Sequence, residues 1–293
     1  MNYGQTFREI RENKGYTLKE VSEGTVSVSF LSKFERGESE ISIQHIHALL
    51  DRLKVTFDEF LFFHNNNQPS ELEAFFNRAH EYYLKRDLQN LQKMHDEQMA
   101  LWDKYKVKPY RCQAVLLKIY ENIIRDKMID GERDGLKDLI DYLFNVEVWT
   151  LYELRLYSKT ILVLDEKMIE TLSKTAYKKS KPYQDLPKIR ETVNNILLNT
   201  IIYLIGPVNQ PKKLVNEQSI QYFFEMVEGN CLETDLLLKT NIMQLKGMYE
   251  VKKGNRDAGL EMVNRAIEVF KDLQAPHLAK DAERYLNLML KYR

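Results

Sequence analysis

The stretch between Thr17 and Gly37, TLKEVSEGTVSVSFLSKFERG, constrains the fold of this chain more than any other segment. Thr17 followed by Glu20 three residues later is the pattern of a capping box, which begins a short helix. Residues 23–25 turn the chain, Ser27 can cap a second helix, and Gly37 ends that helix as a glycine in the left-handed conformation does. Two short helices joined by a tight turn are the layout of a helix-turn-helix unit.

The residues around this unit predict three further helices, so that five short helices make one small domain. A first helix is expected from about Gly4 to Lys14, with Phe7, Ile10 and Arg11 on one side. Thr56 and Glu59 form a second capping box, which opens a last helix ending near residue 63. Between them, a helix capped by Ser42 carries apolar residues at helical spacing, namely Ile43, Ile46, Leu49, Leu50 and Leu53.

The second helix of the unit has a polar face that suits the reading of DNA. Side chains expected to reach base edges are Ser29, Ser32 and Lys33, and Val28 can meet a thymine methyl group. Thr17, Lys19 and Arg36 are better placed for phosphates. Each of these seven residues could equally be an ordinary solvated side chain.

The net charge of the chain gives little support to the expectation of DNA binding. The whole chain has a net charge of zero, and residues 1–62 hold 8 Lys and Arg against 10 Asp and Glu, a net charge of −2. The cations are unevenly placed, because six of these eight precede residue 38. We therefore expect few phosphate contacts and salt-sensitive binding.

After residue 64 the chain reads as a linker and then as a long array of helices. Residues 65–70 are polar and aperiodic and include Pro69, so we expect domains at 1–64 and 71–293 joined by that linker. Ser70 with Glu73 is a third capping box. The predicted helical segments are roughly 70–85, 87–106, 109–126, 132–145, 148–163, 166–179, 186–205, 216–229, 232–253, 256–274 and 276–291.

One repeat is legible inside this array. The segment LKGMYEVKKGNRDAGLEMVNRAIEVF resembles a tetratricopeptide repeat, with Gly247, Gly259 and Ala266 at the small-residue positions where two helices approach closely. Gly254-Asn255 is the expected turn between them. The other pairs match the pattern poorly. The fold class is therefore all-α: a five-helix helix-turn-helix domain followed by a degenerate tetratricopeptide-like α-solenoid.

Several classes of function find no support in the sequence. We expect no enzyme, cofactor or metal site: His45 and His47 lie two apart on a helix, and no nucleophile elbow, phosphate-binding loop or zinc-protease motif occurs. No apolar run reaches the roughly 18 residues of a membrane span, so a cytoplasmic protein is expected. Cys112 and Cys231 form no redox motif and are expected to be reduced core thiols.

The segments GQTFREIRENKGYTLKEVS and VSFLSKFERGESEIS resemble the N-terminal domain of the Rgg family of Gram-positive regulators, which belongs to the wider XRE-type helix-turn-helix class. The helical array that follows extends the resemblance over nearly the whole chain. In that class an Arg late in the first helix commonly pairs with a Glu that ends the recognition helix, which implies a structural pair of Arg11 and Glu35. The turn is about one residue shorter than the class pattern, which leaves the start of the recognition helix open by one residue.

The resemblance also implies a homodimer whose repeat domain binds a short hydrophobic peptide pheromone on its concave face. For such a peptide we select Arg155, which interrupts an apolar helix and could anchor a carboxylate, and Asn195 and Asn199, whose amides could meet a peptide backbone. Asn199 matches a position where the family tends to carry Asn. Alternatively, Arg155 pairs with a Glu of a neighbouring helix, and these amides, with Asn194, cap helices or face solvent.

Together these observations favour a sequence-specific transcription regulator controlled by an intracellular peptide, as in quorum sensing. Its expected partners are promoter DNA with a two-fold-symmetric site, the peptide and a second copy of the chain, with RNA polymerase as a further candidate. The alternative is a protein-interaction scaffold whose repeats bind another protein and whose helix-turn-helix only docks or dimerises. Steep salt dependence of specific DNA binding would separate the two.

Overall fold

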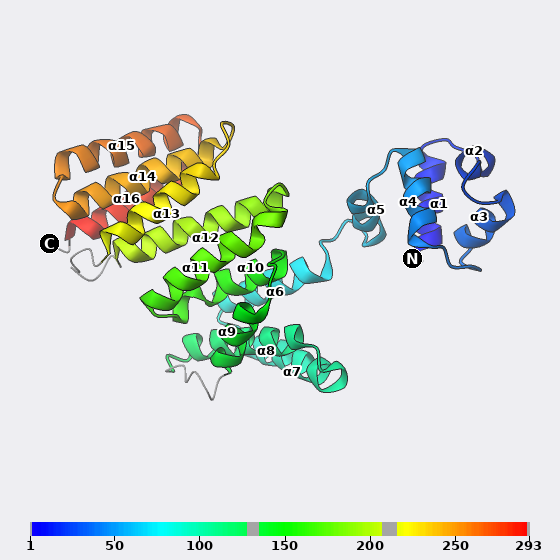
Figure 1. Cartoon of the computed structure of the whole chain (residues 1–293), viewed down its shortest axis with the longest axis horizontal. Coiled ribbons are helices and arrows are strands. Elements are labelled where there is room, and N and C mark those ends of the chain that lie inside the picture. Colours follow the sequence, from blue (N-terminus) through cyan, green and yellow to red (C-terminus); the bar gives the residue numbers. More distant parts are fainter. Residues whose placement is uncertain (1, 128–134, 207–215, 292–293) are drawn as a thin grey trace. The chain divides into compact units, whose positions relative to one another are not determined.

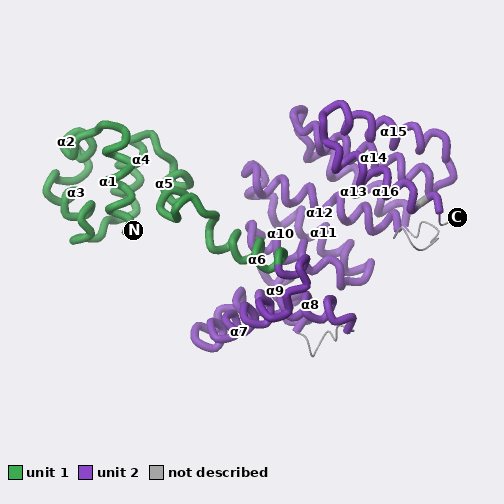
Figure 2. The backbone as a smooth tube through the Cα atoms, turned by 180° about the vertical axis from the view of Figure 1, so that it is seen from behind, with its two compact units in different colours: residues 1–81 green, residues 82–293 purple. Residues whose placement is uncertain are grey.

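The computed structural model describes residues 2–127, 135–206 and 216–291, and every regular element in these ranges is helical (Figure 1). Contacts divide the chain into two compact units, Met1–Glu81 and Tyr82–Arg293 (Figure 2). The predicted linker at residues 65–70 lies inside the first unit, between the fifth and sixth helices.

The first five helices form the small domain expected from the sequence. Three capping predictions are confirmed there, because Thr17 and Thr56 each form a complete capping box and the Ser42 hydroxyl accepts the His45 backbone N–H at 3.3 Å. Gly37 has φ +77°, as the residue that ends the recognition helix requires. The bounds are α1 (Tyr3–Asn13), α2 (Leu18–Ser22), α3 (Val28–Glu35), α4 (Ile43–Leu53) and α5 (Phe57–His64).

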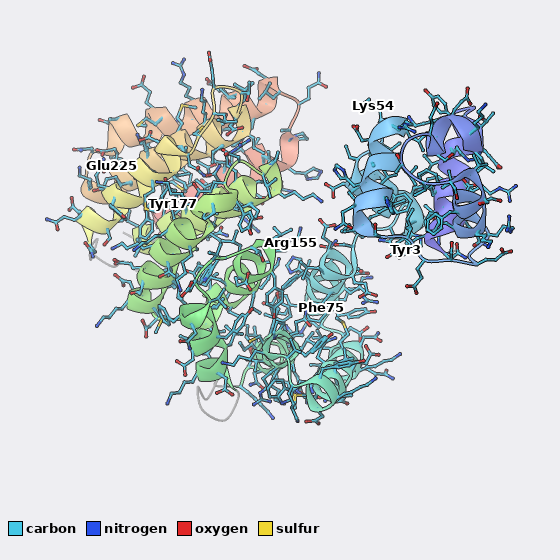
Figure 3. The ribbon with its side chains drawn as sticks, turned by 45° about the vertical axis from the view of Figure 1, so that its right-hand side comes forward. Tyr3, Lys54, Phe75, Arg155, Tyr177 and Glu225 are labelled. Atoms are coloured by element: carbon cyan, nitrogen blue, oxygen red, sulfur yellow. The ribbon has the colours of Figure 1, made fainter. Side chains whose placement is uncertain are left out.

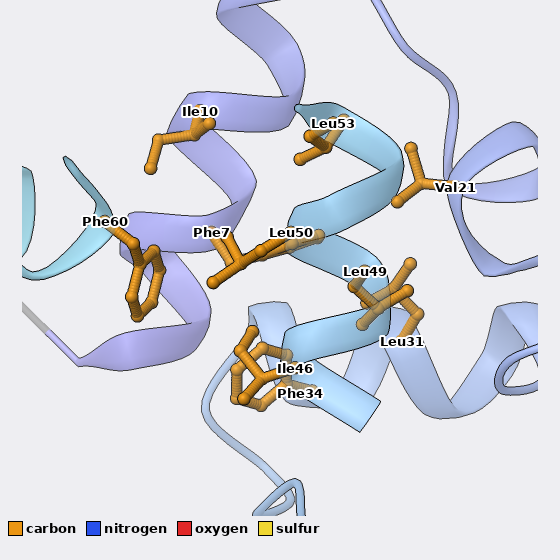
Figure 4. Packing of buried hydrophobic residues seen from close by; sticks show 10 residues of the cluster. All are labelled: Phe7, Ile10, Val21, Leu31, Phe34, Ile46, Leu49, Leu50, Leu53 and Phe60. Atoms are coloured by element: carbon orange, nitrogen blue, oxygen red, sulfur yellow. The ribbon is translucent and has the colours of Figure 1, made fainter. Parts of the chain in front are cut away.

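The core of this domain draws one or more side chains from each of the five helices (Figure 4). Close approach of α1 to α3 requires a glycine at position 4, because a Cβ there would lie 1.8 Å from the Phe34 carbonyl oxygen. The buried residues of the cluster are Phe7, Ile10, Val21, Leu31, Phe34, Ile46, Leu49, Leu50, Leu53 and Phe60.

One apolar residue of the pattern on α4 is not buried. Ile43 shares the helical spacing of the buried residues, yet it is 68% exposed. It stands one turn before Ile46, the first buried position of the helix, and lines an open cavity of about 680 Å³ together with Ile41, Phe57 and Leu61. Its side chain therefore adds little to the core of the domain.

The remaining helices follow the predicted segments closely. The Ser70 hydroxyl accepts the Glu73 backbone N–H at 3.3 Å, as expected for the start of the array. The first part of the segment predicted at 132–145 lies outside the described residues, and the segments predicted to begin at 148 and 232 begin a few residues later. The bounds are α6 (Glu71–Leu84), α7 (Leu88–Tyr105), α8 (Lys108–Ile124), α9 (Leu136–Asn145), α10 (Leu151–Thr160), α11 (Glu166–Ser180), α12 (Pro187–Ile205), α13 (Glu217–Gly229), α14 (Leu236–Lys253), α15 (Arg256–Asp272) and α16 (Pro276–Lys291), with short 3-10 turns at Ile161–Val163 and Lys181–Tyr183.

In the second unit every second helix, from α8 to α14, packs against the next one in the series. α10 contacts both α8 and α12, and α12 contacts α14, while α11 and α13 each pack against α12. This is the neighbour-to-neighbour arrangement of a helical repeat array. The pair α14 and α15 confirms the repeat read from the sequence, because a Cβ on Gly247 would lie 2.7 Å from the Gly259 carbonyl oxygen and one on Gly259 would lie 2.6 Å from that of Gly247.

The two cysteines differ in their surroundings. Cys112 is buried in α8, and burial raises the pKa of its thiol to about 12. Cys231 is only half-buried, so the expectation of a core thiol is wrong for it: it precedes α14 and sits beside a surface pocket rather than inside a helix interface. In the described parts of the chain, no group of three or more potential metal-binding residues occurs, and no helix is long and apolar enough to cross a membrane.

Candidate functional site

The recognition helix α3 turns one face inward and one outward. Leu31, Phe34 and Glu35 are buried against the other helices of the domain. The Ser27 hydroxyl accepts the Phe30 backbone N–H at 3.2 Å, so Ser27 is the N-cap and the helix begins at Val28. This settles the start that the shorter turn had left open.

The outward face of α3 carries the residues predicted to contact base edges. Val28 is 44% exposed, and Ser29 and Lys33 are also exposed, whereas Ser32 is half-buried. The Ser29 hydroxyl lies 3.2 Å from that of Ser27, so it stands at the beginning of the helix. Residues at the N-terminal end of a recognition helix are the ones that reach furthest into a major groove.

A buried ion pair holds α3 against α1. The Arg11 guanidinium donates from Nε and Nη2 to the two carboxylate oxygens of Glu35, each at 2.7 Å, and from Nη1 to the Tyr16 carbonyl oxygen at 2.7 Å. The bond to Glu35 raises the pKa of Arg11. The pairing that the resemblance implied is confirmed, and it holds Glu35 on the buried side of α3.

The three residues predicted for phosphate contacts have different surroundings. Thr17 is occupied as the N-cap of α2: its hydroxyl accepts the Glu20 backbone N–H at 3.3 Å, and its backbone N–H and hydroxyl both donate to the Glu20 carboxylate at 2.7 Å. Lys19 is exposed on the same helix. Arg36 forms a two-bond ion pair with Glu38, both bonds at 2.7 Å, and also donates to the Ser32 hydroxyl.

The ion pair between Arg36 and Glu38 limits how readily Arg36 could bind a phosphate. Its guanidinium lowers the pKa of the Glu38 carboxyl group, so that carboxylate stays charged near neutral pH. A phosphate that binds Arg36 must therefore compete with Glu38. Both side chains are about half exposed, which keeps this competition weak.

The residues predicted to bind a peptide lie on two successive helices of the repeat row. Arg155 is half-buried on α10 (Figure 3), and Asn195 and Asn199 are exposed one turn apart on α12. Because α10 and α12 are in contact, the fold brings these two sets onto neighbouring helices. Asn194 belongs elsewhere: it is buried, and its amide oxygen accepts from the Asn230 side chain at 2.6 Å.

Two residues that were not selected from the sequence lie beside the selected ones in the chain or one helical turn away. Phe30 is half-buried on α3, next to Ser29, and offers an apolar surface beside the polar one. Lys159 follows Arg155 by one helical turn and is half-buried, and burial together with the positive charge of Arg155 lowers the pKa of its ammonium group. The spacing of four residues on a helix was the signal that could have identified Lys159.

Comparison with known proteins gives matches to both parts of the chain. The family model described as HTH-type transcriptional regulator Rgg, C-terminal domain, matches residues 88–284, and a helix-turn-helix model matches residues 7–60. The fold resembles the Streptococcus dysgalactiae SHP pheromone receptor Rgg2, with a TM-score of 0.79 and 23% identity over 98% of this chain and 99% of that chain. It also resembles PrgX in its complex with iCF10, with a TM-score of 0.71 and 17% identity over 99% of this chain and 98% of that one.

Proposed function

The chain belongs to the Rgg family of HTH-type transcriptional regulators, and we propose that it binds promoter DNA through α3 and is controlled by a short hydrophobic peptide bound to its helical repeats. The observation that carries the DNA part is the outward face of α3, where Ser29 and Lys33 are exposed on a helix whose other face is fixed in the core. Direct readout would come from Val28, Ser29, Ser32 and Lys33.

The contacts to phosphates would be few. Lys19 is the exposed cation of α2, Arg36 would exchange its partner Glu38 for a phosphate, and Thr17 would offer its hydroxyl from the start of α2. Each phosphate neutralised contributes about 0.9 to the slope of log affinity against log salt concentration, so we expect a modest slope per domain.

The peptide part of the proposal draws on the repeat domain. Rgg2 is described as a pheromone receptor and PrgX has been solved with iCF10, which supports a peptide ligand for a chain of the same fold. Arg155 and Lys159 would attract a carboxylate of the peptide, and Asn195 and Asn199 would bond to its backbone. Since Arg155 and Lys159 are both half-buried, a carboxylate between them would meet two partly desolvated cations.

The regulator would act in the cytoplasm as a homodimer, because a two-fold-symmetric site needs two copies of α3 about 34 Å, or a multiple of this distance, apart. We assign DNA binding to residues 1–64, a linker to 65–70, and peptide binding and dimerisation to 71–293. A peptide that favours one arrangement of the repeats would change DNA affinity or contact with RNA polymerase only through its differential binding.

An in vitro selection of genomic fragments tests the DNA part. The native protein and the double variant Ser29→Ala/Lys33→Ala are compared at about 0.15 M salt, where non-specific binding is largely screened. The native protein should enrich a two-fold-symmetric site and the double variant should not. Lys54→Ala is the matched control, since Lys54 is the exposed residue at the end of α4 and pairs with Asp51 at 3.1 Å. Equal enrichment by the double variant would contradict the assignment.

Peptide binding is tested with synthetic peptides encoded near the recovered promoters. Arg155→Ala and Asn199→Ala should each weaken binding by about tenfold, the value of one hydrogen bond to a charged or buried group. Asn264→Ala, an exposed amide on α15, should leave binding unchanged. Tight binding by all three variants would place the peptide elsewhere, and salt-insensitive capture of a protein with no DNA enrichment would favour the scaffold alternative.

A further inference from the structure

The helix α2 ends in carbonyl groups that its own backbone leaves without donors. It has only five residues, Leu18–Ser22, and the turn that follows bends at Gly24, which has φ +69°. The Ser22 carbonyl oxygen accepts two backbone bonds, from Thr25 at 3.0 Å and from Val26 at 3.1 Å. The carbonyls of Val21 and Glu23 have no backbone donor among the bonds of the described residues.

Arg52, which lies on α4, supplies the missing bonds. Its Nη1 donates to the Val21 carbonyl oxygen at 2.9 Å and to that of Glu23, and the Glu20 carbonyl oxygen lies 3.5 Å from the same nitrogen. A cation at this end of a helix also interacts favourably with the helix dipole. Arg52 therefore serves as a tertiary cap for α2.

This contact ties the turn to a rigid helix. The neighbour of Arg52, Leu53, is buried in the core with Leu49 and Leu50, so α4 is held firmly in the domain. A helix as short as α2 has little stability by itself and depends on such external contacts. Four residues after Glu23 the chain reaches Ser27, the N-cap of α3, so the peptide groups that Arg52 binds lie directly before the start of α3.

We propose that Arg52 is a positioning residue for DNA recognition: its guanidinium sets the direction of α3 through the turn between α2 and α3, without itself binding a phosphate. The inference rests on the proposed function, because it assigns a role within DNA reading. All of these contacts come from one nitrogen, Nη1, so a lysine, whose ammonium group also carries several N–H donors on one nitrogen, can replace part of them.

The test compares Arg52→Ala, Arg52→Lys and the control Lys54→Ala with the native chain. Binding is measured to the duplex recovered by selection and to poly(dI-dC), each over a series of salt concentrations. Arg52→Ala should weaken binding to the selected duplex by about tenfold, leave poly(dI-dC) binding unchanged and keep the native salt slope. Arg52→Lys should fall between the native chain and Arg52→Ala, and Lys54→Ala should match the native chain.

The salt slope separates positioning from direct phosphate binding. Lys19→Ala, the reference for a phosphate contact, should reduce the slope by about 1. If Arg52→Ala produces the same reduction, Arg52 binds a phosphate and the inference is wrong. A purely structural role would weaken the binding of both duplexes in proportion to the loss of folded protein, which thermal unfolding measures.

Hydrogen exchange tests the inference without DNA. In the free protein the Glu23 amide donates to the Lys19 carbonyl oxygen at the end of α2, and the amides of Thr25 and Val26 donate to the Ser22 carbonyl oxygen across the turn. Arg52→Ala should make them exchange faster by about tenfold or more, while the amides of Leu49 and Leu50 keep their native rates. Unchanged exchange at the turn overturns the inference. Should the native chain select no duplex, the proposed function fails, and faster exchange at the turn still supports the contact through which Arg52 acts.

Discussion

Arg11 and Glu35 join α1 to the end of α3 inside the helix-turn-helix domain. Their side chains are 8% and 4% exposed, and the guanidinium donates to the two oxygens of Glu35 and to the Tyr16 carbonyl at 2.7 Å, with a longer bond of 3.4 Å to Glu12. Burying two charges costs desolvation energy that their attraction only offsets, so the pair adds little net stability, but removing one partner leaves the other charge buried and unpaired.

We predict that Arg11→Ala lowers the free energy of unfolding of the helix-turn-helix domain by about 3–5 kcal/mol. The double variant Arg11→Met/Glu35→Leu should recover most of this loss, because apolar side chains of similar size replace both charges. Urea unfolding followed by far-UV circular dichroism measures both. Arg8→Ala is the control: it breaks the exposed pair with Glu12 and should cost about 0.5 kcal/mol or less. An equal loss for both single variants would contradict the role of burial.

At the scale of elements, capping boxes between residues three apart determine where helices α2 and α5 of the helix-turn-helix domain begin. In the boxes at α2 and α5 one carboxylate oxygen accepts both the backbone N–H and the hydroxyl of a threonine, at 2.7 Å in α2 and 2.8 Å in α5. These bonds favour the charged form and lower the pKa of Glu20 and of Glu59.

The lowered pKa of Glu20 predicts how the α2 cap responds to acid. The folded pKa lies below the unfolded value, so the cap's contribution is complete above the ordinary pKa of 4.5 and is lost as the pH falls through the folded pKa. Carboxyl chemical shifts followed by NMR should give a Glu20 midpoint below 4.5. In Thr17→Val the hydroxyl bond is lost and the backbone bond remains, so the midpoint should move part of the way back. A midpoint at or above 4.5 in the native chain would contradict the capping bond.

The pair α14 and α15 depends on two glycines. A side chain at Gly259 would meet the Gly247 carbonyl oxygen and the backbone nitrogen of Val251, and backbone atoms cannot move aside as a flexible side chain can. Gly259→Ala should therefore force the helices apart and lower the free energy of unfolding of the repeat domain by about 1–3 kcal/mol.

Tryptophan fluorescence during urea unfolding measures this effect, because Trp102 and Trp149 both lie in the second unit. Gly229→Ala is the matched control, since a Cβ at Gly229 meets nothing within 4 Å. We expect that control to unfold like the native chain. A loss of stability in Gly229→Ala as large as that in Gly259→Ala would show that close approach is not the cause.

At the scale of the whole molecule, the proposed DNA site and the proposed peptide site lie in different units. The effect of one ligand on the affinity for the other is therefore a coupling free energy that can be measured. If the peptide changes the affinity for the selected duplex by some factor, the duplex must change the peptide affinity by the same factor. Lys33→Ala should weaken DNA binding while the peptide affinity of the DNA-free protein stays at its native value. Titration calorimetry measures four affinities: that of the duplex with and without the peptide, and that of the peptide with and without the duplex. If Lys33→Ala lowers the affinities for DNA and for peptide in parallel, the division into two sites is wrong.

Local signals in the sequence determined much of this protein. Short helices could be bounded from the sequence because their end signals are local. The capping boxes at Thr17 and Thr56 each join residues three positions apart, and Gly37 ends a helix by its own left-handed conformation. The small residues at 247 and 259 identified the closely packed pair of helices in the same way. The match of the segment before Gly37 to a family pattern also implied the partner of Arg11.

The tertiary structure decided which of several locally equivalent residues does what. Helical spacing treats Ile43 like Ile46, yet only the second is covered by neighbouring helices. Asn194 and Asn195 are adjacent in the chain, but one is buried against Asn230 and the other is exposed. In the sequence Arg52 looks like an ordinary surface cation, and only the packing of α4 beside α2 shows its bonds to the Val21 and Glu23 carbonyls. Burial and long-range hydrogen bonds depend on which elements lie next to each other, and the periodicity of a single helix carries no information about its neighbours.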